Sequence, residues 1–100
     1  FGNLTITDAN IALNNTSGTG NGLAGVDING PFNFVNINNS RIFQNQGDGV
    51  EIDNTTVTFP FRSTYTLTDN IISFNGRDGV EFVASGDGSL TIAGTNTTLS

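Results

Sequence analysis

Five carboxylates recur at two positions of a repeated motif, and they are the side chains of this sequence best placed to do chemistry. Three stand in the middle of apolar–acidic–apolar triplets and two stand just before such triplets: Asp27, Glu51 and Glu81, then Asp48 and Asp78. If the triplets are neighbouring strands, like charges lie about 4.8 Å apart and repel each other. Calcium takes six to eight oxygen ligands and would relieve that repulsion. The pattern therefore predicts a calcium site, and a solvated acidic face is the alternative.

The same acids can be compared with the needs of an enzyme. A retaining glycoside hydrolase holds two carboxyl groups about 5 Å apart. Glu51 and Glu81 would meet that spacing simply because adjacent strands are that far apart. A lyase needs a base, and the nearby cations are Arg41 and Arg77, of which Arg41 aligns with uncharged residues in the other copies of the motif. We therefore expect no catalytic residues and no enzymatic activity in this segment.

The composition excludes several classes of function. The chain has no Cys and no His, so it has neither a disulfide framework nor the usual zinc ligands and general bases. The chain has three Arg and no Lys against nine Asp and Glu residues, which gives a net charge of -6. Phosphate backbones and anionic membranes repel so acidic a chain. We expect no nucleic-acid partner, no membrane insertion and no cofactor other than calcium.

An internal repeat organises the chain. Its matched positions are, in order, Ile6, Ile37 and Leu67; then Ile11, Ile42 and Ile72; then Asn14, Asn45 and Asn75. Each full copy continues into a Gly-Val-acid-apolar run, although the first copy carries seven extra residues within residues 16–24. A fourth copy begins near Ile92 and stops early. So many matches in one register predict a repeat fold.

Each copy alternates short strand patterns with turns rich in Asn and Gly. Residues 5–7, 36–38 and 66–68 alternate polar and apolar side chains, as half-buried strands do, and no window has helical periodicity. One copy cannot bury its apolar residues, so the copies must stack. We predict an all-β parallel solenoid of three to four coils without helices, forming one segment over residues 1–100.

Stacking the copies predicts which residues share a column. The interior columns are Ile6, Ile37, Leu67 and Ile92, and then Val26, Val50 and Val80. Asn14, Asn45 and Asn75 fall at one corner, where their amides can hydrogen-bond in a ladder that also satisfies the backbone of the turn.

Two runs of the repeat resemble a known family. Residues 42–52 read IFQNQGDGVEI and residues 72–82 read ISFNGRDGVEF. They are similar to the right-handed parallel β-helix repeat of pectate-lyase-like proteins, which is found in bacterial surface proteins, adhesins and polysaccharide-active enzymes. The resemblance covers about two coils well, and it implies a right-handed β-helix in a secreted or cell-surface protein. It does not identify a function, because that fold carries many.

The sequence also offers glycosylation sequons and one interruption of the repeat. The sequons begin at Asn3, Asn14, Asn15, Asn38, Asn54 and Asn96. Residues 53–65 leave the repeat pattern and include Phe59 and Phe61. We expect a longer corner with an extra strand, whose Phe side chains pack on the solenoid, and a protruding recognition loop is the alternative.

The short stack leads to the functional expectation. A few coils leave apolar core and unpaired strand edges at both ends, and neither terminus has the pattern of a capping segment. We expect a structural or adhesive segment of an extracellular fibre or surface protein. Its partners would be itself, stacked end to end into filaments, or flanking coils of a longer chain, together with glycans. The alternative is a fragment of a polysaccharide lyase or hydrolase with a glycan-binding face.

Overall fold

The computed structural model describes residues 2–12, 24–29, 32–54, 62–83, 88–94 and 98–99. Every regular element within these ranges is a strand, and none is a helix. This confirms the all-β part of the prediction. The described ranges contain no helix long and apolar enough to cross a membrane.

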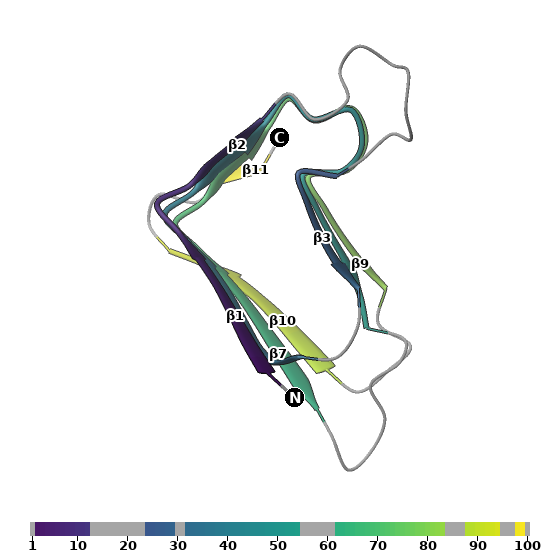
Figure 1. Cartoon of the computed structure of the whole chain (residues 1–100). Coiled ribbons are helices and arrows are strands. Elements are labelled where there is room, and N and C mark those ends of the chain that lie inside the picture. The colour runs from purple at the N-terminus through teal and green to yellow at the C-terminus, as the bar shows by residue number, and fades with distance from the viewer. Residues whose placement is uncertain are drawn as a thin grey trace.

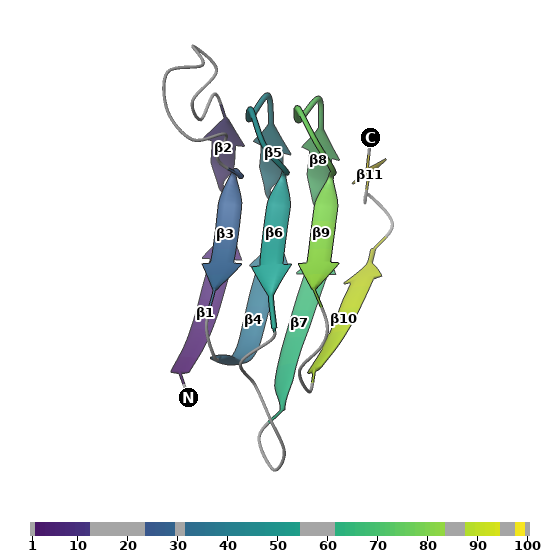
Figure 2. The same ribbon diagram turned by 90° about the vertical axis from the view of Figure 1, so that its right-hand side faces the viewer.

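The strands form three sheets in which all neighbours run parallel. Sheet A consists, in spatial order, of β1 (Gly2–Thr7), β4 (Phe32–Asn38), β7 (Ser63–Thr68) and β10 (Gly88–Ala93). Sheet B consists of β2 (Asn10–Ala12), β5 (Arg41–Phe43), β8 (Ile71–Ser73) and β11 (Thr98–Leu99). Sheet C consists of β3 (Val26–Asn29), β6 (Val50–Asp53) and β9 (Val80–Val83). Figure 2 shows the strands of each sheet side by side.

The chain visits sheets A, B and C in turn, and we call one such circuit a coil. Coil 1 is β1 to β3, coil 2 is β4 to β6, coil 3 is β7 to β9, and coil 4 contributes β10 and β11. Figure 1 looks along the stack and shows the three sheets around a common interior. The links from sheet C back to sheet A run through residues 30–31, 55–61 and 84–87, which lie outside the described residues, so the described part does not close the circuit.

Two predicted features fall mostly on residues that the structure does not describe. The extra residues of the first copy are expected within residues 16–24, of which the structure describes residue 24 alone, and the expected packing of Phe59 and Phe61 falls in 55–61. Of the interrupted segment 53–65, the described part shows β6 ending at Asp53 and β7 beginning at Ser63.

The register between coils aligns equivalent residues of the repeat. Ile6 pairs with Ile37, Ile37 with Leu67, and Leu67 with Ile92. In sheet C, Val26 pairs with Val50 and Val50 with Val80. These pairings are the interior columns that the repeat predicts.

The core is most extensively buried in coils 2 and 3, and its residues in sheet A are less buried at both ends of the stack. The buried apolar residues are Val26, Ile28, Val35, Ile37, Ile42, Val50, Ile52, Tyr65, Leu67 and Ile72. The half-buried residues that pack against them include Leu4 and Ile6 in coil 1 and Val80 and Phe82 in coil 3. Burying one such side chain contributes about 1.5–3 kcal/mol. Coil 2 contains five of these ten buried residues and therefore supplies more of this free energy than any other coil.

The corner after each sheet A strand uses a left-handed backbone conformation. Asp8, Asn39 and Asp69 have φ values of 56°, 50° and 56°, and Gly94 occupies the fourth position with φ 110°. Asp, Asn and Gly tolerate this region, whereas other residues pay about 1–2 kcal/mol. All four stand two residues after the first repeat position, so the spacing could have revealed this corner.

Buried polar side chains tie the coils together behind that corner. The Ser40 N–H donates to Asn70 Oδ1 at 2.9 Å, and Asn70 Nδ2 donates to the Ile37 carbonyl at 2.8 Å. Both side chains lie in the interior. They satisfy backbone groups that the sharp turn takes out of the sheets.

Candidate functional site

The predicted Asn ladder lies at the corner between sheets B and C. Asn45 Nδ2 donates to Asn75 Oδ1 at 2.9 Å, and the Asn45 N–H donates to the same oxygen at 3.1 Å. Each amide also reaches the coil before it, since Asn45 Nδ2 is 3.4 Å from the Ile11 carbonyl and Asn75 Nδ2 is 3.2 Å from the Ile42 carbonyl. Asn14 lies outside the described residues. We call Asn45 and Asn75 the amide ladder.

Glycine brings the coils close together beside this ladder. A Cβ atom at Gly49 would lie 2.6 Å from the Gly79 carbonyl oxygen and 2.7 Å from Asn75 Nδ2. Real Cβ atoms essentially never lie so close to other atoms, so the approach of the two backbones requires glycine at position 49. This approach sets the position of Asp48, the residue just before Gly49.

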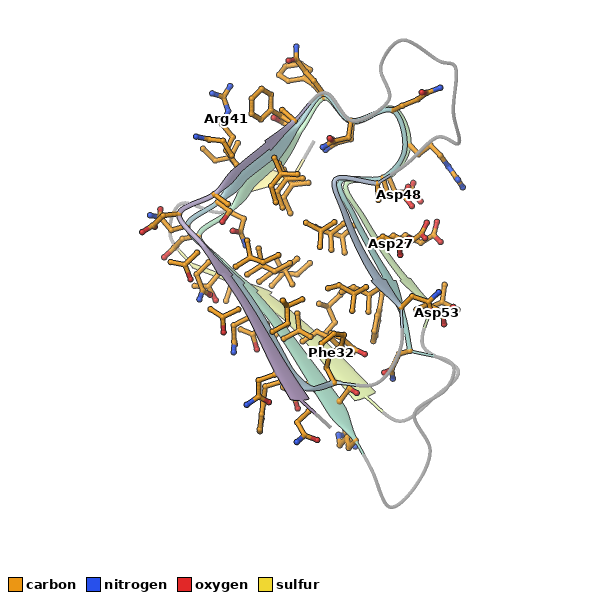
Figure 3. The ribbon with its side chains drawn as sticks, viewed as in Figure 1. Asp27, Phe32, Arg41, Asp48 and Asp53 are labelled. Atoms are coloured by element: carbon orange, nitrogen blue, oxygen red, sulfur yellow. The ribbon has the colours of Figure 1, made fainter. Side chains whose placement is uncertain are left out.

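Three of the five predicted carboxylates converge immediately outside the ladder. One ligand oxygen from each of Asp48, Glu51 and Glu81 lies within 4.8 Å of the other two. Asp48 comes from the corner of coil 2, Glu51 from β6, and Glu81 from β9 of coil 3. We call these three residues the acidic cluster. Figure 3 shows Asp48 in the bend where the corner meets sheet C.

Asp48 is the buried member of the cluster, with 2% of its surface exposed. Its Oδ1 accepts a hydrogen bond from the Asp78 N–H at 2.8 Å. Among the described residues no donor reaches its Oδ2. An unpartnered carboxylate oxygen in the interior is costly, because it has lost its water without gaining a donor.

The pKa of Glu51 is raised by burial and also by the neighbouring carboxylates. Burial raises the pKa of Glu51 above its ordinary value of 4.5, and contact with the Asp48 carboxyl and the charges of Asp27 and Glu81 raise it further. Among the described residues, Arg77 forms an ion pair with the cluster, since its Nη2 is 3.9 Å from Glu81 Oε2. Its side chain is 63% exposed, so water screens much of that ion pair.

The other two predicted ligands lie beside the cluster and not in it. Asp27 is exposed on β3 and pairs with Glu51 in the register of sheet C. Figure 3 shows its side chain projecting outward. Asp78 is exposed at the corner of coil 3 and gives the cluster only its N–H. Asp78 repeats the position of Asp48 one coil later, so it would need the acids of a further coil to form an equivalent cluster.

The two arginines considered as lyase bases lie apart. Arg41 is on β5 of sheet B, where its guanidinium stacks 4.3 Å from the centre of the Phe43 ring. Figure 3 shows it on the other side of the molecule from Asp48 and Asp27. Arg77 alone accompanies the acids.

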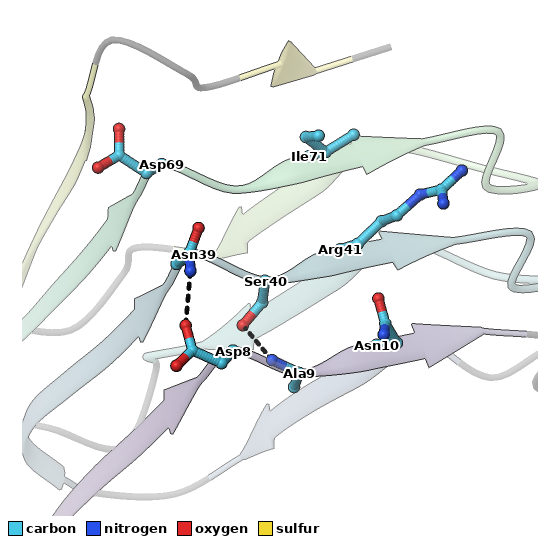
Figure 4. A pocket seen from close by; sticks show the side chains of 8 residues that line it. All are labelled: Asp8, Ala9, Asn10, Asn39, Ser40, Arg41, Asp69 and Ile71. Atoms are coloured by element: carbon cyan, nitrogen blue, oxygen red, sulfur yellow. Dashed lines mark hydrogen bonds between the residues drawn. The ribbon is translucent and has the colours of Figure 1, made fainter.

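A second polar feature is a hollow of about 350 Å³ on the outside of the corner between sheets A and B (Figure 4). Its lining residues are Asp8, Ala9, Asn10, Asn39, Ser40, Arg41, Asp69 and Ile71. Asn39 Nδ2 donates to Asp8 Oδ1 at 2.6 Å, and the Ala9 N–H donates to Ser40 Oγ at 3.2 Å. None of the five predicted metal ligands lines it.

The sequons differ in access. Asn3 is exposed on β1 and Asn38 is half-buried at the end of β4. Asn54 is fully buried, and its Oδ1 accepts a hydrogen bond of 2.6 Å from the Tyr65 hydroxyl. Glycan attachment at Asn54 would require this pair to break. Asn14, Asn15 and Asn96 lie outside the described residues.

Comparisons with protein-family models, curated proteins and solved structures found no match to this chain. Nothing in them identifies the pectate-lyase-like family.

Proposed function

We propose that this chain is a segment of a right-handed parallel β-helix that acts as a structural rod in an extracellular fibre or surface protein. Its two ends would join further coils, either of a longer chain or of a second copy stacked end to end. An exterior rich in Asn, Thr and Asp would then face water, ions or glycans along the rod.

The observation that carries this proposal is the state of the two ends of the stack. At one end lie β1, β2 and β3, and at the other β10, β11 and β9, each paired on one side only among the described strands. An edge strand presents a row of free N–H and C=O groups, which is a template for another parallel strand. Open edges on all three sheets favour continuation of the stack.

The side chains at these ends support the same view. Ile92 occupies an inward position on β10, yet 37% of its surface is exposed. Leu4, Ile6 and Ile11 are only half-buried at the opposite end. Another coil placed on either end would cover these residues, as the neighbouring coils cover Ile37. A head-to-tail contact of this kind does not close on itself and generates fibres.

The polysaccharide-active alternative stands second. It needs a base beside the acids, but Arg41 lies on another sheet and Arg77 is ion-paired with Glu81. The oxygens of the three clustered acids lie within 4.8 Å of one another, a closeness that adjacent strands impose on any stacked acids and that is therefore no sign of catalysis.

The test is assembly of the purified chain at neutral pH with calcium present, followed by analytical ultracentrifugation and negative-stain electron microscopy. We expect filaments or larger assemblies with an axial repeat of a few strand spacings, each about 4.8 Å. Ile92→Lys, which puts a charge on the apolar end, should leave the chain monomeric. A wild-type chain that stays a discrete monomer at all concentrations would contradict the proposal.

A matched variant on the same strand controls for charge. Thr91 precedes Ile92 and points to the outer face, because side chains alternate along a strand. Thr91→Lys should therefore assemble like the wild type. If both variants block assembly equally, the contact does not run through the apolar end.

A further inference from the structure

We propose that Asp48, Glu51 and Glu81 bind one calcium ion that bridges coils 2 and 3. The site would act as a clamp between two strands of sheet C, next to the amide ladder. This inference is independent of end-to-end stacking, because all three ligands lie within one chain.

The first support is the unpartnered oxygen of Asp48. The side chain is almost completely buried, and its Oδ1 is held by the Asp78 N–H. That hydrogen bond fixes the carboxylate, while Oδ2 receives no donor from the described residues. A carboxylate oxygen of Glu51 lies within 4.8 Å of one of Asp48. Two carboxylates in contact have no hydrogen between them when both are ionised, so a cation is the partner that satisfies both.

The size of the cluster fits calcium. Two oxygens bound to one calcium ion at 2.3–2.6 Å can be at most about 5 Å apart. The three oxygens here lie within 4.8 Å of one another, whereas magnesium, at about 2.1 Å, needs opposite ligands to be about 4.2 Å apart. Three carboxylates leave the remaining coordination positions to water and to carbonyl oxygens.

The charges around the cluster point the same way. Glu51 lies between Asp27 and Glu81 in the register of sheet C, so like charges face it from both neighbouring strands. The only basic side chain paired with these acids among the described residues is the largely exposed Arg77. A divalent ion would convert this repulsion into attraction between adjacent coils.

A proton shared by Asp48 and Glu51 is the competing explanation. The proton would form a hydrogen bond between the Asp48 and Glu51 carboxyls, but it would not involve Glu81. The stability that it gives would not depend on calcium. The experiment must therefore compare calcium with chelator at constant pH.

The test is thermal unfolding of the wild type and of Asp48→Asn at pH 7.5, with either 5 mM calcium chloride or EDTA. In EDTA the variant should melt higher, because the Asn amide keeps an acceptor for the Asp78 N–H and donates to Glu51. In calcium the order should invert, because the wild type binds the ion at least tenfold more tightly than the variant and gains more stability from it. An order that is the same in both buffers would overturn the proposal.

Calorimetric titration with calcium alone measures the site directly. We expect one ion per chain with a dissociation constant on the order of 10⁻⁴ to 10⁻³ M, as in extracellular modules with few ligands. Asp48→Asn and Glu81→Gln should each weaken binding about tenfold or more, in line with the loss of a charged ligand. Glu81 is half-buried at the surface, so its variant remains informative if Asp48→Asn unfolds.

Asp78→Asn is the matched control, because Asp78 occupies the same repeat position but lies outside the cluster. Its calcium affinity should change less than twofold. Equal weakening by Asp78→Asn and Asp48→Asn would mean that the ion is held diffusely by the acidic face, and no heat of binding in the wild type would mean a shared proton. Either result would overturn the proposal.

Discussion

The amide ladder and the acidic cluster lie next to each other in coils 2 and 3, but they differ in whether their polar atoms have hydrogen-bond partners. In the amide ladder, Asn45 donates to Asn75 and each Asn also reaches a backbone carbonyl. In the acidic cluster, Asp48 is as deeply buried as Asn45, yet one of its oxygens has no donor among the described residues.

The difference lies in the hydrogen-bond donors and acceptors that each side chain presents to the equivalent side chain of the next coil. An amide carries both a donor and an acceptor, so a stack of Asn satisfies itself. An ionised carboxylate carries acceptors alone, so a stack of Asp and Glu needs a donor, a proton or a cation from elsewhere. Buried Asn residues can therefore recur at the same position of successive coils without any other group. Buried Asp or Glu residues at such a position need a donor, a proton or a cation as a partner.

The substitution with the largest expected effect replaces an amide of the amide ladder by a carboxylate like those of the acidic cluster. Asn45→Asp keeps the shape of the side chain but replaces its donor by an acceptor facing Asn75 Oδ1. We expect a loss of about 3 kcal/mol or more at pH 7, since the new charge is buried without a partner. Chemical denaturation measures this loss, which should shrink at acidic pH, where the protonated carboxyl can donate.

Asn3→Asp is the control for that substitution, because Asn3 is exposed on β1. It adds the same charge to an already acidic chain and should cost less than about 0.5 kcal/mol. Equal losses for the two variants would show that net charge, not the missing donor, is responsible.

The second-largest expected loss of stability concerns Gly49, where the backbones of coils 2 and 3 approach closely between the amide ladder and the acidic cluster. Gly49→Ala would place a Cβ 2.5 Å from Ile72 Cγ2 and 2.6 Å from the Gly79 carbonyl oxygen. We expect a loss of about 2–3 kcal/mol, typical of overpacking. Gly2→Ala, where a Cβ would meet nothing within 4 Å, should be nearly neutral in the same denaturation experiment.

The smallest effect is the pH dependence contributed by Glu51. Its pKa is raised, through burial, the contact with Asp48 and the charges of Asp27 and Glu81. A raised folded-state pKa contributes stability that is present below the ordinary value of 4.5 and is lost as the pH rises through the folded value.

The measurement for Glu51 is the difference in unfolding free energy between Glu51→Gln and the wild type in EDTA. This difference should grow in favour of the variant as the pH rises from 4 to 8. Arg77 is unaltered in both proteins, so its ion pair with Glu81 does not enter the difference. A difference that is constant over this range would contradict the assignment.

The stacking register was accessible from the sequence because it depends on spacing alone. Ile37 stands 31 residues after Ile6, and Leu67 stands 30 residues after Ile37. The strands that carry them pair in that register. The amide ladder follows from the same spacing. The left-handed corner at Asp8, Asn39 and Asp69 obeys it too, and required only attention to residue types that tolerate positive φ.

The burial of individual polar residues could not be predicted in this way. Asp48 and Asp78 are equivalent in the repeat, but a following coil covers Asp48 and none of the described residues covers Asp78 in that manner. Asn54 matches a sequon, yet its side chain turns inward to the Tyr65 hydroxyl. Spacing locates a residue along the coil, whereas its surroundings depend on the neighbouring coils and on how each corner bends.

The most direct test of the contrast between the amide ladder and the acidic cluster is an anomalous difference map from crystals of the chain grown with terbium. Terbium substitutes for calcium. We predict a single strong peak about 2.3–2.6 Å from oxygens of Asp48, Glu51 and Glu81, and no peak beside Asn45 and Asn75. A well-ordered cluster without a peak, in which the Asp48 and Glu51 carboxyls share a short hydrogen bond, would contradict the account.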